Sequence, residues 1–156
     1  MTLEQIVTYF QNFAGSHMQL HGFGYGEEVN LTIPEFPLYV NPTGYNITPV
    51  NYPILYVVPV ERVISNTLLI YRFTCIVADR VQKDGRDRVH IESDTLQILL
   101  DLIADMEQQQ TDFTLDKQIS ISPFINRFAD LLIGNEANIN LRQPFSFDAC
   151  AIPTNS

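Results

Sequence analysis

The sequence of 156 residues lacks tryptophan, has only two cysteines and contains no long apolar run. Cys75 and Cys150 form neither a CxxC pair nor another metal-like spacing, so buried free thiols are expected. No apolar run approaches the length of a membrane span. Because the first residues contain no basic or apolar segment of the secretory type, we expect a protein that is made in the cytoplasm and stays soluble or assembles there.

Basic residues are also scarce, with 9 Lys and Arg against 18 Asp and Glu, which gives a net charge of −9. Free nucleic-acid binding is therefore not expected, because affinity for phosphate needs clustered basic side chains. An acidic surface could instead line a passage through which DNA slides without sticking. Charged residues make up only 17% of the chain and apolar ones 46%, which favours a subunit whose surface is largely covered.

The strongest pattern in the chain is an amphipathic helix at 93–106. One apolar stripe at helical spacing comprises Leu96, Leu99, Leu100, Ile103 and Met106. Ile98 and Leu102 form a second, shorter stripe beside it. We expect the first stripe to pack on a sheet of the same chain. The second either lies in the same core or faces a neighbouring subunit, which makes Ile98 and Leu102 candidate interface residues.

The rest of the chain alternates between helical and strand patterns. Thr2 and Gln5 fit a capping box at the start of a helix over 2–14. The second helix is expected over about 91–109, and Gly134-Asn135 is expected to form a turn. Alternating or β-branched runs predict strands, which lie at 54–60, 68–81, 118–124 and 137–142. The order α-β-β-α-β-β predicts a single α+β domain over 1–156, with two helices on one face of a mostly antiparallel sheet.

Residues 16–52 have the least regular pattern and are expected to form a long loop, with a short strand near 36–40. A loop of this length is uncommon unless it binds something or orders against a partner. Its aromatic residues argue against simple disorder. The part at 27–51 is interpreted as an insertion.

A basic tract precedes the acidic second helix. Residues 80–88 contain four of the nine basic residues, whereas residues 92–116 contain seven acids and no base. This arrangement could join neighbouring copies of the chain, so Lys83, Arg86 and Arg88 are candidate interface residues. The alternative is a loop and a helix face that are simply solvated.

Three groups were considered for chemistry or binding. The glycine-rich stretch 22–26 lacks the spacing and the lysine of a phosphate-binding loop, and a loop anchored by its aromatic residues is the preferred interpretation. His17 and His21 are four residues apart, but the glycines around them make a metal-binding helix doubtful, and no metal site is predicted. His90 could act as a base, yet no nucleophile signature accompanies it.

Asp101 and Asp105 lie one helical turn apart. Paired carboxylates can do acid–base work when burial shifts one pKa. A charged outer helix face is the preferred interpretation of this pair. No catalytic residue and no cofactor is predicted.

The order helix, long loop, hairpin, helix, hairpin resembles the small tail terminator or tail-completion proteins of tailed bacteriophages. The segments that carry the resemblance are 2–10 (TLEQIVTYF), 52–60 (YPILYVVPV), the strand ending at Asp79, 93–103 (SDTLQILLDLI), 144–145 (PF) and 150–153 (CAIP). Together they cover nearly the whole chain except 27–51.

The resemblance implies a structural virion protein without an active site. It would be one of six or more copies in a ring at the head–tail joint, assembled in the host cytoplasm. The second helix and the sheet edges would meet neighbouring copies, and tail-tube or connector (portal-ring) proteins would lie next to the ring. Genomic DNA would pass through in contact with the acidic face, without sequence-specific binding.

Two other classes of function remain open. The first is a small cytosolic α+β enzyme or ligand-binding domain that uses His90 and the glycine-rich stretch 22–26. The second is a cytosolic adaptor whose loop at 16–52 docks a partner.

Overall fold

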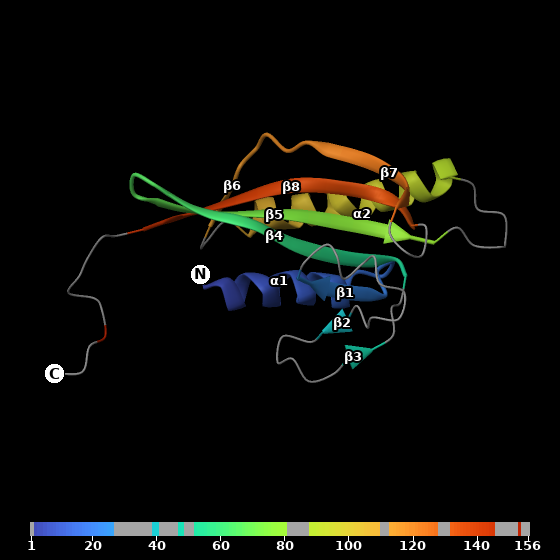
Figure 1. The fold of residues 1–156 in the computed structure, drawn as a ribbon, viewed down its shortest axis with the longest axis horizontal. Coiled ribbons are helices and arrows are strands. Elements are labelled where there is room, and N and C mark those ends of the chain that lie inside the picture. The colour runs from blue at the N-terminus through green and yellow to red at the C-terminus, as the bar shows by residue number, and fades with distance from the viewer. Residues whose placement is uncertain are drawn as a thin grey trace.

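The protein has an α+β fold, as the sequence predicts (Figure 1). The computed structural model describes residues 2–26, 39–40, 47–48, 52–80, 88–109, 113–127, 132–145 and 153. Within these residues, two helices cover one face of a six-stranded sheet. The helices run in opposite directions across that face (Figure 1). Their bounds are Leu3–Ser16 for α1 and Arg88–Gln108 for α2.

The main sheet has the order β1-β4-β5-β8-β6, and β7 pairs with the same edge of β8 as β6. Its strands are β1 (Gly22–Tyr25), β4 (Ile54–Ser65), β5 (Leu68–Asp79), β6 (Thr114–Leu115), β7 (Ile121–Arg127) and β8 (Leu132–Pro144). Every pairing is antiparallel except that of β1 with β4. Two further short strands, β2 (Tyr39–Val40) and β3 (Ile47–Thr48), pair with each other.

The predicted strands are present, but the expected loop at 16–52 is not a loop throughout. Residues 22–25 form β1, which adds a parallel edge strand to β4. Two glycines in a four-residue segment weaken a strand signal, so local pattern alone does not reveal it. The buried Phe23 anchors β1 in the helix-side core. β2 overlaps the short strand expected near 36–40, and the rest of 27–51, apart from β3, lies outside the described residues.

Helix α1 begins with the predicted capping box. The backbone N–H of Gln5 donates to Thr2 Oγ1 at 3.2 Å, and the N–H of Thr2 donates to Gln5 Oε1 at 2.8 Å. These bonds pair two backbone donors that the first turn of a helix leaves free. Ile6, Phe10 and Ala14 then face the sheet.

Strands β4 and β5 form a long hairpin whose tip extends beyond the ends of both helices (Figure 1). The turn is tight, since Ser65 pairs with Leu68 and Asn66 adopts a positive φ of 55°. Asn tolerates this conformation better than most residues. The register shifts between Pro59 and Glu61, so Val60 lies in a β-bulge.

The sheet has an apolar cluster on each face. The cluster under the helices draws on α1, α2 and alternate residues of the strands, including Leu55, Val57, Tyr71, Phe73, Cys75, Val77, Ala137, Ile139 and Leu141. The predicted alternation along β5 is therefore confirmed. The cluster on the opposite face contains Ile54, Tyr56, Ile76, Ala78, Phe124 and Leu132.

The predicted orientation of α2 is wrong. Ile98 and Leu102 are 1% and 0% exposed and lie in the helix-side core, so they form no outer surface. Leu96 and Leu100, which were expected to face the sheet, are 36% and 43% exposed. Leu99 and Met106 are buried, as expected.

A polar contact beneath the helix explains this orientation. Thr95 is buried, and its hydroxyl accepts a hydrogen bond from Asn135 Nδ2 at 3.0 Å. The same amide donates to the carbonyl of Glu92 at 2.9 Å, and the Thr95 hydroxyl donates to the carbonyl of Ile91 at 2.8 Å. With Thr95 turned inward and its polar atoms paired, its neighbour Leu96 faces outward.

The predicted turn at Gly134-Asn135 is also wrong, because both residues lie inside β8. Gly134 forms no turn, and it is needed because strands β5 and β8 approach each other closely at this position. A Cβ atom at this position would lie 2.0 Å from the Val77 carbonyl oxygen in β5. The glycine therefore allows β8 to pack tightly beside β5.

Candidate functional site

The outward face of α2 carries three exposed apolar residues, Val89, Leu96 and Leu100, which we call the outer stripe. Val89 and Leu96 are seven residues apart, and Leu96 and Leu100 are four apart, so all three lie on one side of the helix. Val89 is 70% exposed. Isolated exposed apolar side chains are ordinary, but a row on one helix face is typical of a contact surface.

A second surface lies at the bulge of the β4–β5 hairpin, at a groove of about 210 Å³. Residues from both strands line this hairpin groove, namely Pro59, Val60, Glu61, Arg62, Tyr71, Arg72 and Phe73. Val60 is exposed, as is Ile64 further along β4. Arg72 pairs with Glu61, whereas Arg62 has no ion-pair partner among the described residues.

Polar side chains join the two helices along their shared side. The hydroxyl of Tyr9 in α1 donates to Asp105 Oδ2 in α2. His17, just after α1, has its Nε2 2.9 Å from Asp101 Oδ2. The backbone N–H of Gln19 donates to His17 Nδ1 at 3.2 Å, which leaves Nε2 as the nitrogen that donates to the carboxylate. Asp101 and Asp105 thus hold α1 to α2 and do not form the outer acidic face that was expected.

The bond between Tyr9 and Asp105 predicts a stability cost for removing the hydroxyl. Burial and the neighbouring carboxylate raise the pKa of Tyr9 far above its ordinary value, so the hydroxyl stays protonated and donates. We expect Tyr9→Phe to lower the free energy of unfolding by about 1–2 kcal/mol. Urea denaturation measures this loss. The loss should shrink in an Asp105→Asn background, and an unchanged loss there would contradict the assigned bond.

The bond between His17 and Asp101 predicts a pH dependence. The hydrogen bond from His17 lowers the pKa of Asp101 below its ordinary value of 3.8, against a smaller opposing effect of burial. A carboxyl whose pKa is lower in the folded state stabilises that state above its unfolded pKa, and the effect disappears as the pH falls through the folded pKa. The Asp101 side chain is 43% exposed, so solvent screening limits the effect to about 1 kcal/mol or less.

Replacing Asp101 with Asn should therefore lower stability at pH 7 and have little effect near pH 2. Thermal melts of the two proteins at both pH values measure the difference. An equal difference at both pH values would show that the charge of Asp101 is not what stabilises the contact.

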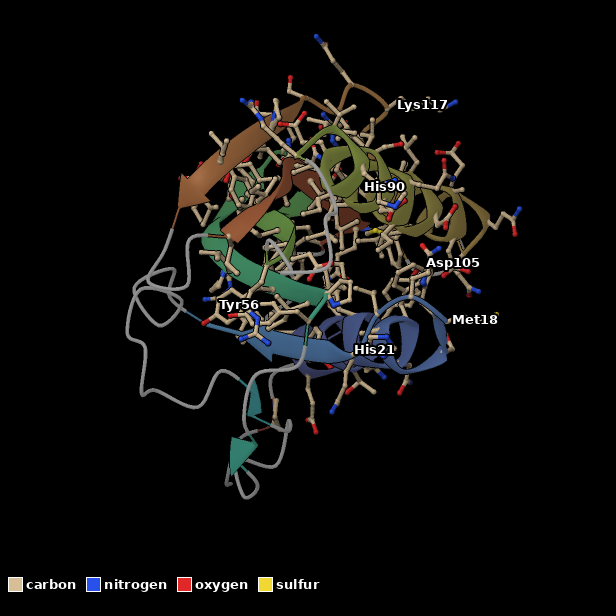
Figure 2. The ribbon with its side chains drawn as sticks, turned by 90° about the vertical axis from the view of Figure 1, so that its right-hand side faces the viewer. Met18, His21, Tyr56, His90, Asp105 and Lys117 are labelled. Carbon is tan, nitrogen blue, oxygen red and sulfur yellow. The ribbon has the colours of Figure 1, made fainter. Side chains whose placement is uncertain are left out.

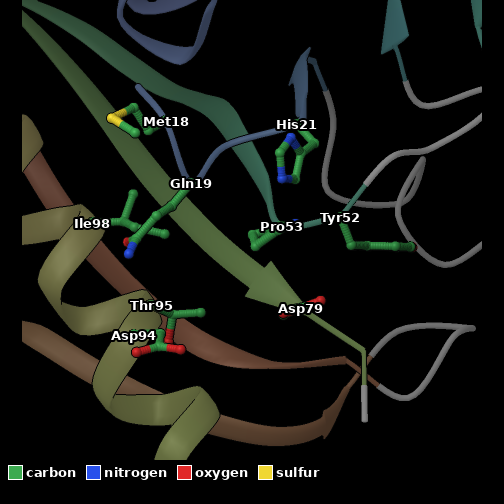
Figure 3. Close-up of a pocket in the computed structure, with 9 residues that line it drawn as sticks. All are labelled: Met18, Gln19, His21, Tyr52, Pro53, Asp79, Asp94, Thr95 and Ile98. Carbon is green, nitrogen blue, oxygen red and sulfur yellow. The ribbon is translucent and has the colours of Figure 1, made fainter. Parts of the chain in front are cut away.

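A polar cavity of about 270 Å³ lies where residues 18–21 approach the first half of α2 (Figure 3). Its walls come from four parts of the chain and comprise Met18, Gln19, His21, Tyr52, Pro53, Asp79, Asp94, Thr95 and Ile98. Asp79 is only 2% exposed, and its Oδ1 accepts the backbone N–H of Arg80 at 2.8 Å. The Arg80 guanidinium lies 4.8 Å from the centre of the Tyr52 ring. Two carboxylates in the wall would favour a cationic group over an anion.

The structure places the other predicted residues apart from this cavity or on the surface. Arg88 is exposed and its Nε lies 2.7 Å from Glu92 Oε1, one helical turn away. Lys83 and Arg86 lie outside the described residues. His90 lies on α2 with its Nε2 3.4 Å from Asp94 Oδ2, away from His21 (Figure 2). The glycine-rich stretch lies in the sheet as β1, where its backbone pairs with β4.

Sequence reasoning did not identify the outer stripe or the hairpin groove. The spacing of Val89, Leu96 and Leu100 was visible in the sequence, but Leu96 and Leu100 were assigned to the core. For the groove, the available signal was Pro59 inside an otherwise continuous strand pattern, which indicates an edge or a bulge.

No helix in the described part of the chain is long and apolar enough to cross a membrane. Among the same residues, no group of three or more His, Cys, Asp or Glu side chains is placed to hold a metal ion. Comparison of the chain with models of known protein families and with curated proteins finds no match.

Proposed function

We propose that this chain is a structural subunit of a ring at the head–tail joint of a tailed bacteriophage, as a tail terminator or tail-completion protein. Six or more copies would close around a channel through which the genome passes, next to tail-tube or connector proteins. The protein would assemble in the host cytoplasm and remain in the virion.

One observation carries this proposal: the chain has two different surfaces with exposed apolar side chains, the outer stripe on α2 and the hairpin groove, where Val60 is exposed among charged residues. A closed ring of more than two copies needs two unlike surfaces on each subunit, because each copy contacts its two neighbours through different faces. A dimer with two-fold symmetry needs only one. The order of the elements also roughly matches the order on which the resemblance to tail terminator proteins is based.

The charge of the chain is compatible with a DNA passage. A net charge of −9 provides no general attraction for phosphate groups. A channel lined by such a surface would let DNA move through without binding a particular sequence.

Negative-stain electron microscopy of the purified protein tests the proposal. We expect closed rings with a central opening, alone or after addition of tail-tube or connector rings. Particles no larger than a monomer at high concentration, with those partner rings present, would contradict it.

The cavity beside Asp79 favours a second candidate, a small ligand-binding or enzyme domain. That candidate uses His90, whose ion-pair partner Asp94 lines the cavity, whereas a ring protein gives His90 no chemical role. The ion pair of His90 with Asp94 is exposed and joins residues one helical turn apart, so His90→Ala should change the free energy of unfolding by less than about 0.5 kcal/mol. We expect ring formation to survive this substitution. Loss of ligand binding or turnover in His90→Ala, with the fold intact, would favour the second candidate.

A further inference from the structure

We infer that the outer stripe of α2 in one copy docks into the hairpin groove of the next copy, so that these two surfaces form the repeating contact of the ring. This inference rests on the proposed function, because a contact between two unlike surfaces gives either a closed ring or an open filament, and the proposed function requires the ring. The occupant of each surface is therefore a second copy of this chain.

The first argument is size and reach. A cavity of about 150 Å³ can hold benzene, so a groove of about 210 Å³ has room for the four-carbon side chain of a leucine. The apolar part of its lining comes from Pro59, Val60, Tyr71 and Phe73, and Glu61, Arg62 and Arg72 lie beside them. Leu96 and Leu100 provide such side chains on an outward helix face. The tip of the β4–β5 hairpin extends beyond both helices (Figure 1). Val60 in the groove is 58% exposed, so another molecule can reach it.

The second argument is charge. Glu92, Asp94, Asp101 and Asp105 of α2 already have partners within the chain. Glu107 is exposed near the end of the helix face that carries the outer stripe, and it has no ion-pair partner among the described residues. The groove presents Arg62, which likewise lacks a partner among these residues. The unpaired Glu107 beside the outer stripe is therefore complementary to the unpaired Arg62 at the hairpin groove.

The same charges argue against the simplest alternative, in which α2 packs against α2 of a second copy. That contact would offer the unpaired Glu107 no free basic partner among the described residues of α2, because Arg88 already pairs with Glu92. The hairpin is the surface that offers the opposite charge.

The test uses one variant of each surface. Leu100→Asp places a carboxylate in the outer stripe, and Val60→Asp places one in the hairpin groove. Both positions are exposed in the single chain, so each variant should fold with a circular dichroism spectrum and melting curve like those of the parent. Each alone should weaken self-association by on the order of 30-fold or more and sediment as a monomer. Asn12→Asp, which adds the same charge on the exposed side of α1, is the matched control and should still form rings.

Mixing the two variants gives the decisive result. The intact groove of Leu100→Asp can accept the intact stripe of Val60→Asp, and no further copy can then be added. We therefore expect an equimolar mixture to form a 1:1 dimer in sedimentation velocity, although neither variant associates alone.

Four results would overturn the inference. In the first, either variant alone still forms rings, and in the second, the mixture of the two variants stays monomeric. In the third, a two-copy assembly is lost in Leu100→Asp but kept in Val60→Asp. In the fourth, the control Asn12→Asp loses assembly as strongly as the two variants do. The third result would identify a contact between two α2 helices. If the unsubstituted protein forms rings and one of these results appears, the contact is wrong but the proposed function stands. If the unsubstituted protein forms no ring under any condition, the proposed function itself is contradicted.

Discussion

Replacing Leu102 with aspartate is expected to unfold the monomer or to lower its melting temperature by roughly 10–20 °C. The side chain is 0% exposed and lies in the helix-side core. Loss of its packing costs about 2–5 kcal/mol, and a buried polar group without a partner costs about 1–3 kcal/mol more. The sum is comparable with the whole stability of a typical domain. Thermal unfolding followed by circular dichroism measures the effect.

Leu100→Asp is the control for this substitution, because it makes the same chemical change two residues earlier on the exposed side of the same helix. It should shift the melting temperature by only a few degrees. A Leu102→Asp protein that stays folded and merely fails to assemble would show that Leu102 faces a neighbour after all. The orientation of α2 described above would then be incorrect.

Replacing Gly134 with alanine is expected to destabilise the sheet by at least about 3 kcal/mol. The added Cβ would lie 2.0 Å from the Val77 carbonyl oxygen and 2.9 Å from the Ala78 Cα. Both are backbone atoms of β5, so no side-chain rotation can relieve the overlap. The strands would have to separate at the centre of the sheet, where β5 and β8 are paired over their whole length.

The same substitution at Gly15 should have the opposite sign. Gly15 lies near the end of α1, and a Cβ atom there would meet nothing within 4 Å. Alanine at such a site should stabilise the protein by about 0.5–1 kcal/mol, because it restricts the unfolded chain and favours helix. Urea denaturation of both variants compares the two effects. Equal effects at the two positions would contradict the close approach of β8 to β5.

Helices and strands were predictable from the sequence where apolar residues recur at regular spacing and where characteristic residues mark the end of the element. The capping box at Thr2 and Gln5 and the alternation along β5 depend on neighbouring residues only, and both are found in the structure. The α+β class followed from the order of these elements.

What the sequence did not reveal depends on contacts between distant residues. The orientation of α2 follows from Thr95 and Asn135, which are forty residues apart and each resemble a surface residue when considered alone. β1 is a strand because β4 lies beside it, not because of its own composition. Gly134 resembles a turn residue until the backbone of β5 is seen next to it.

The candidate surfaces were missed for the same reason. A helix with two adjacent apolar stripes has more apolar positions than one sheet face can cover, and only the packed structure shows which stripe remains outside. The sequence predicted correctly that the helix has apolar residues to spare, but it could not identify them as Val89, Leu96 and Leu100.

The mass of the assembled protein tests the central claim of a ring subunit most directly. Native mass spectrometry of the purified chain at high concentration should show one closed assembly of six or more copies, with no series of intermediate sizes. A monomer or a dimer at every concentration, with tail-tube or connector rings also present, would contradict the claim.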